Sequence, residues 1–112
     1  MNFFLIILLF IAVDSIWLIG GSSLSSKMVR DIQGSPITIR FIPAILVYVA
    51  LAYLVYLPKT SKEAFLLGLS VYAVYDFTNL AILKNYSLQF ALMDSIWGGI
   101  LMTIVWNIFK NY

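Results

Sequence analysis

The chain has 112 residues, of which 62% are hydrophobic and 11% are charged, and its net charge is +2. Soluble proteins are about half apolar and a quarter charged, so this chain has too little polar surface to cover a water-soluble core, and we expect an integral membrane protein. It has no cysteine and no histidine, which excludes disulfides and argues against zinc sites and against Ser–His or Cys–His catalysis. The basic residues lie at the ends of apolar segments, where they suit lipid head groups and not nucleic acid.

Four apolar runs follow one another, at about residues 2–19, 41–57, 64–83 and 90–109. Each is close to the roughly 20 residues that an α-helix needs to cross about 30 Å of hydrocarbon. Short polar turns separate the last three runs, which makes these helices antiparallel neighbours. The sequence therefore predicts an all-α, multi-pass fold, a four-helix antiparallel bundle that forms a single membrane domain over residues 1–112.

The first connection, residues 20–40, is longer than the other two. Within it Leu24, Met28 and Ile32 recur at helical spacing beside charged residues, which predicts a short helix lying on the membrane surface. A plain exposed loop is the alternative.

Three aspartates interrupt the apolar runs: Asp14, Asp76 and Asp94. An ionisable residue at bilayer depth costs several kcal/mol unless it is neutralised or paired, so each one marks a candidate functional site. Two of them belong to nearly the same phrase, Val-Asp-Ser-Ile-Trp at 13–17 and Met-Asp-Ser-Ile-Trp at 93–97. The alternative for all three is interhelical hydrogen bonding that only fixes the bundle, although serine or asparagine would do this at lower cost.

Counting residues from the helix ends places the three carboxyl groups at one depth. At 1.5 Å per residue they lie roughly 6–11 Å below the membrane face that carries the first and third connections, and Tyr48 reaches the same level. Polar residues of membrane bundles generally face the interior. We therefore predict one shared pocket, open towards these connections.

Further residues share faces with the aspartates by helical spacing. Tyr72 and Asn79 lie on the face of Asp76, each tryptophan of the repeated phrase is one turn from its aspartate, and Gly98 and Gly99 let a neighbour or a ligand approach closely. The alternatives are membrane-interface positions for the tryptophans and helix packing for the tyrosines; Tyr86 is expected to be an interface anchor. The predicted ligand- or ion-binding site comprises Asp14, Asp76, Asp94, Asn79, Thr78, Tyr48, Tyr72, Trp17 and Trp97.

Three carboxylates in a medium of low dielectric constant cannot all be charged without compensation. They share protons, or a cation sits among them. Oxygen-only ligands suit Mg²⁺, Ca²⁺, Mn²⁺, Na⁺ or protons, so Asp14, Asp76 and Asp94 are the predicted metal ligands, and the expected cofactor is a cation bound by oxygen atoms. A basic residue of the first connection, such as Arg30 or Arg40, offers a peripheral counter-charge.

The segment Tyr72–Leu80, which reads YAVYDFTNL, resembles the YATYDLTNL signature of a family of small membrane proteins known as domain of unknown function 2177. The stretches at 14–18 and 94–98 resemble the family's D-x-x-W-L in the first helix and D-I-x-W-G in the last. Val74 departs from the usual threonine. The resemblance implies a four-helix membrane fold and implies no activity.

The favoured functional hypothesis is cation- or proton-linked transport or channel activity. A chain of this size is too thin to enclose a pathway alone, so we expect a homo-oligomer in contact with membrane lipids and without a nucleic-acid partner. One alternative is a membrane-embedded enzyme or enzyme subunit that acts on lipid head groups with a divalent metal, because the aspartates are shallow. Another is a structural partner in a membrane assembly. Whether the chain is an enzyme stays open at this point.

Overall fold

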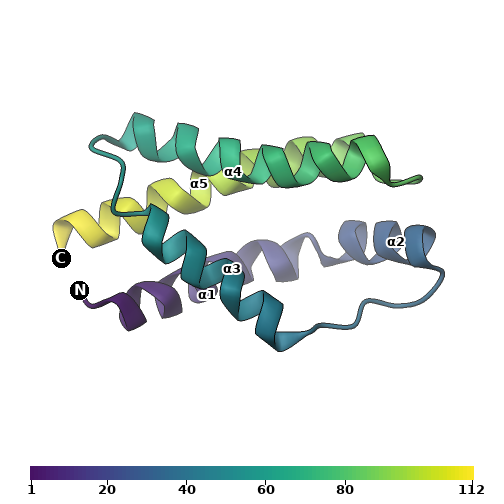
Figure 1. Cartoon of the computed structure of the whole chain (residues 1–112), viewed down its shortest axis with the longest axis horizontal. Helices are drawn as coiled ribbons and strands as arrows, with labels where there is room; N and C mark the ends of the chain where they lie inside the picture. The colour runs from purple at the N-terminus through teal and green to yellow at the C-terminus, as the bar shows by residue number, and fades with distance from the viewer.

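The computed structural model covers all 112 residues and contains five helices and no strand. The helices are α1 (Phe3–Gly20), α2 (Ser22–Gln33), α3 (Phe41–Leu54), α4 (Ser61–Ile82) and α5 (Leu88–Asn111) (Figure 1). This confirms the predicted all-α fold. Three of the helices, α1, α4 and α5, are long and apolar enough to cross a membrane.

Helix α3 is shorter than its apolar run. It has 14 residues, which correspond to a length of about 21 Å. The helix gives way to a tighter turn in which the N–H groups of Tyr56 and Leu57 bond to carbonyls three residues back. Pro58 follows, and a proline disfavours helical geometry at the residue before it. The structure thus provides three candidate spans and one shorter apolar helix, where the sequence predicts four spans of similar length.

The first connection contains a helix, as predicted, and not the alternative plain loop. Helix α2 ends at Gln33 and is capped by Gly34, which has a left-handed backbone (φ 73°) and donates its N–H to the carbonyl of Arg30. Met28 on the apolar stripe of α2 is buried against Tyr86 and Phe90. Helix α2 therefore covers the end of the bundle at which α4 turns into α5.

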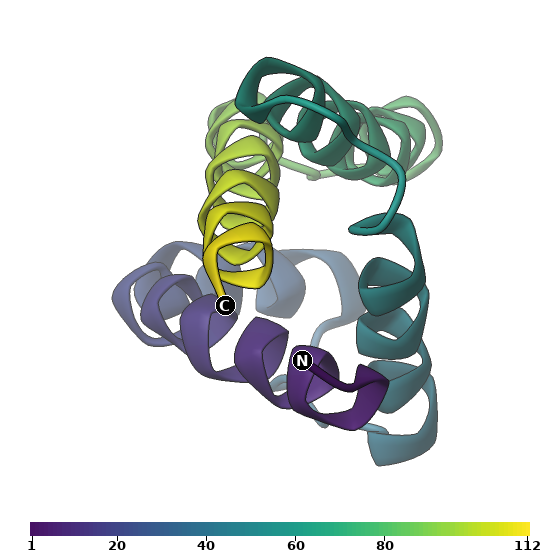
Figure 2. The ribbon, with the colours of Figure 1, turned by 90° about the vertical axis from the view of Figure 1, so that its left-hand side faces the viewer.

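Four helices form a ring when the protein is viewed along its long axis, in the order α4, α5, α1 and α3 (Figure 2). Helices α4 and α5 pack along their length, α5 packs on α1, and α1 packs on α3. Helices α3 and α4 are consecutive in the chain yet barely touch. The bundle is consequently closed on three sides of the ring and loose on the fourth.

The closest approach of α4 and α5 depends on glycine. A Cβ atom at Gly68 would lie 2.2 Å from the carbonyl oxygen of Gly98, and one at Gly98 would lie 2.3 Å from Cγ of Tyr72. Small residues of this kind let the backbones of membrane helices come together. Gly98, one of the two glycines near Asp94 in the sequence, is thus in contact with the neighbouring helix α4.

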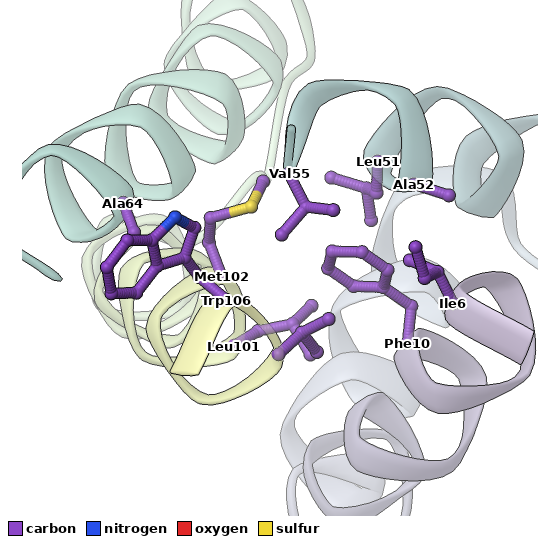
Figure 3. Close-up of a cluster of buried hydrophobic side chains, with 10 residues drawn as sticks. Ile6, Phe10, Leu51, Ala52, Val55, Ala64, Leu101, Met102 and Trp106 are labelled. Atoms are coloured by element: carbon purple, nitrogen blue, oxygen red, sulfur yellow. The ribbon is translucent and has the colours of Figure 1, made fainter. Parts of the chain in front are cut away.

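The main hydrophobic core lies at the end of the bundle that holds the two termini (Figure 1). Phe10 and Leu101 are fully buried there, and Val55, the residue after the end of α3, packs with them (Figure 3). The aspartates lie between this core and α2, because they occupy the later part of α1 and α4 and the early part of α5.

Candidate functional site

All three aspartates are buried, with exposed fractions of 6% for Asp14, 0% for Asp76 and 6% for Asp94. They come from α1, α4 and α5. Every side chain that donates a hydrogen bond to them is neutral: Trp17, Trp97, Tyr48, Tyr86 and Ser95. No Lys, Arg or His lies within residues 3–20, 41–54, 64–82 or 88–109 to supply a counter-charge. The carboxyl groups are therefore held by aromatic and hydroxyl donors.

The repeated Asp-Ser-Ile-Trp phrases bond to each other. Nε1 of Trp17 in α1 donates to Oδ1 of Asp94 in α5 at 2.8 Å, and Nε1 of Trp97 in α5 donates to Oδ1 of Asp14 in α1 at 2.7 Å. Aspartate and tryptophan are three residues apart, so they differ in depth by about 4.5 Å. Because the two helices run in opposite directions, each tryptophan comes level with the other helix's aspartate.

Asp14 also connects α1 to α3. The Tyr48 hydroxyl donates to Oδ2 of Asp14 at 2.6 Å. Tyr48 thus lies at the level predicted by residue counting, and a single carboxylate joins three helices, α1, α3 and α5.

Asp76 lies in contact with Asp94, its neighbour across the α4–α5 interface. It accepts hydrogen bonds from the Tyr86 hydroxyl at 2.7 Å and from the Ser95 hydroxyl at 3.5 Å. Asp76 and Asp94 therefore form a carboxyl pair, while Asp14 is bonded separately to Tyr48 and Trp97.

The prediction that Tyr86 is an interface anchor is wrong. Its side chain is only 9% exposed because Met28 of α2 and Phe90 of α5 cover it. Asn85 precedes it in the turn between α4 and α5 with a left-handed backbone (φ 69°), and its side-chain amide donates to the carbonyl of Asp31. Burial, followed by the bond to Asp76, raises the pKa of the Tyr86 hydroxyl, so this group remains a proton donor. The turn residue Asn85 is the one sequence signal that points to this position.

The remaining predicted residues divide into two sets. Asn79 lies beside the hydroxyls of Tyr75 and Tyr86. Thr78 is exposed and lies outside the network, because two residues along a helix turn it about 200° away from Asp76.

Two cavities flank Asp94. The larger, of about 440 Å³, is lined mainly by α3 and α4 and reaches Asp94 through apolar walls. The smaller, of about 210 Å³, lies on the side of α1 and α2 and includes Asp14, Trp17 and Ser25 in its lining. Three residues line both cavities: Tyr72, Tyr75 and Asp94.

The structure contains no group of three or more acidic side chains arranged to hold a metal ion. The tryptophan donors occupy one oxygen of Asp14 and one of Asp94, and Tyr48 occupies the other oxygen of Asp14. The joint role of Asp14, Asp76 and Asp94 as metal ligands thus stays a prediction without support from this geometry.

Apolar helices of spanning length and buried, aromatic-bonded carboxyl groups define a small helical membrane protein. The chain belongs to the family described as "Predicted membrane protein (DUF2177)", whose family model matches residues 1–108. This confirms the resemblance found in the sequence. No curated protein and no solved structure matches the chain.

Proposed function

We propose that this membrane protein performs cation- or proton-linked transport, or conducts such an ion, with Asp94 as the group that binds it. The observation that carries the proposal is the position of Asp94, which lines one cavity between α3 and α4 and a second cavity beside α1 and α2. A carboxyl group that lines two cavities can bind an ion that arrives through one of them, and the smaller cavity, which includes Asp14 and Ser25 in its lining, is the route with polar walls.

The charge balance of the Asp76–Asp94 pair supports the same function. The two carboxyl groups are in contact and buried, and all of their hydrogen-bond donors are neutral. Two adjacent carboxylates in an environment of low dielectric constant need a shared proton or a cation. Protons and cations are therefore the ligands that this pair favours, and Tyr72 and Tyr75 line both cavities together with Asp94.

A homo-oligomer embedded in lipid is part of the proposal. Large apolar side chains on the outside of the ring are exposed, among them Ile16, Leu46 and Val74. In a membrane they contact acyl chains or a second copy of the chain. A second copy would complete a pathway that one thin ring of helices leaves open.

Ion flux in liposomes tests the proposal. Purified protein is reconstituted, and an imposed gradient of H⁺, Na⁺ or K⁺ is followed with dyes inside the vesicles. We expect flux of at least one of these ions, reduced at least tenfold in Asp94→Asn. Asp31→Asn, which neutralises an exposed aspartate of α2, is the matched control and should conduct like the wild type. The proposal would be refuted if vesicles with wild-type protein showed no more flux than protein-free vesicles, or if Asp94→Asn and Asp31→Asn showed the same flux.

A further inference from the structure

The larger cavity has a composition that selects its ligand. Of its eight lining residues seven are hydrophobic, and the eighth is Asp94. Val47 and Leu51 form part of the α3 wall, and Val71 with Tyr75 forms part of the α4 wall. A volume of about 440 Å³ is within the usual range for a small-molecule site.

This cavity lies on the loose side of the helix ring. Helices α3 and α4 barely touch, and Val47, Ala50 and Tyr75 on its walls are also exposed on the outside of the protein. These residues belong to apolar helical segments, so in a membrane the cavity faces acyl chains. A ligand that dissolves in the bilayer can enter from the side.

The electrostatics of the cavity favour a positive charge. Asp94 supplies a carboxyl group at its inner end, and no Lys, Arg or His lies in the surrounding helical segments to bind an anion. Tyr72 and Tyr75 are among the lining residues, and an aromatic ring attracts a cation that lies over its face. A small hydrated metal ion would lose its water shell in this cavity, because the apolar walls supply no ligand atoms to replace the water.

We propose that the α3–α4 cavity binds a lipophilic organic cation, with its apolar body between α3 and α4 and its charge against Asp94. This inference rests on the proposed function in one respect, since it names the substrate class for the same aspartate. The apolar lining of the α3–α4 cavity, with Asp94 as its one charged residue, supports the inference independently of the proposed function.

The test uses two probes of the same shape and opposite charge. Tetraphenylphosphonium and tetraphenylborate are titrated into the purified full-length protein in detergent micelles, and binding is measured by calorimetry with empty micelles as the blank. We expect saturable binding of the cation and at least tenfold weaker binding of the anion. Equal binding of the two probes would show partition into the micelle and would overturn the inference.

Two variants and their matched controls localise the binding. Asp94→Asn removes the charge, and Val71→Phe fills the cavity from α4; each should weaken tetraphenylphosphonium binding at least tenfold. Asp31→Asn and Val74→Phe are the controls, because Asp31 lies on α2 and Val74 is exposed on α4 outside the cavity lining. Helix content and melting temperature identify a variant that fails to fold, in which case the other cavity variant decides. Unchanged binding in a folded variant would overturn the inference.

The outcomes separate this inference from the proposed function. Flux of H⁺, Na⁺ or K⁺ that depends on Asp94, without binding of tetraphenylphosphonium, would refute the inference and leave the proposed function in place. Binding of tetraphenylphosphonium that depends on Asp94, without flux of any ion tested, would support the inference and refute the proposed function.

Discussion

Replacing Gly68 with alanine should separate α4 from α5. The added Cβ would lie 2.2 Å from the Gly98 carbonyl oxygen and 2.6 Å from Cβ of Met102, whereas ordinary contact begins at 3.4 Å. The atoms that it meets are backbone and a Cβ atom, which cannot rotate away, so the helices have to move apart by about 1 Å. Overpacking typically costs 1–3 kcal/mol, and we expect about 3 kcal/mol here.

The measurement is the free energy of unfolding in mixed detergent and dodecyl sulfate micelles, followed by helical circular dichroism. Gly20→Ala is the matched control, because a Cβ atom at Gly20 meets no heavy atom within 4 Å. Alanine is the better helix former, so this control should be neutral or stabilised by up to about 1 kcal/mol. Equal unfolding free energies for the two variants would refute the claim that α4 and α5 touch at Gly68.

Three further predictions concern the bonds around the aspartates and the position of α2. The first uses double-mutant cycles of unfolding free energy, in which Asp14→Asn and Trp97→Phe should be coupled by about 1 kcal/mol because these two side chains are bonded. Asp14→Asn and Trp17→Phe should be additive within about 0.5 kcal/mol, because Trp17 bonds to Asp94 instead. Equal coupling in both cycles would contradict the crossed bonding. Tyr86→Phe removes a buried hydrogen-bond donor from Asp76 and should lower the unfolding free energy by about 1–3 kcal/mol. Tyr53→Phe is the control, because the Tyr53 side chain is 64% exposed, and it should change the unfolding free energy by less than about 0.5 kcal/mol. Similar effects of the two substitutions would place Tyr86 at the surface. Met28→Ala should speed amide hydrogen exchange in α2 at least tenfold and leave residues 101–106 unchanged, with Lys27→Ala as the exposed control; unchanged exchange in α2 would mean that Met28 does not hold it.

The depth of the aspartates could be read from the sequence because helical rise is constant. Counting residues from the ends of the apolar runs places Tyr48 level with Asp14, and the structure joins these two side chains. Helical spacing likewise puts each tryptophan on the face of its own aspartate. Neither rule says which tryptophan reaches which carboxylate, since that depends on which helices are antiparallel neighbours.

The contacts between helices could not be predicted in this way. Lipid is as apolar as the helix surfaces, so hydrophobicity does not select the neighbours; close packing and polar bonds do. The connection of α3 to α4 is short, yet the two helices barely touch, because the glycines of α4 and α5 bring those two helices together instead. The cavity beside Asp94 and the burial of Tyr86 under α2 both follow from such contacts, and no periodicity in the chain encodes them.

The crossed bonding of the two Asp-Ser-Ile-Trp phrases also affects the order in which the protein is made. A ribosome delivers Asp14 first, its partner Tyr48 comes 34 residues later, and Trp97 comes 83 residues later. The carboxyl group of α1 therefore stays without its full set of donors until the residues of α5 have been translated. Completion of the last helix satisfies both phrases at once, since it brings Asp94 to Trp17 and Trp97 to Asp14.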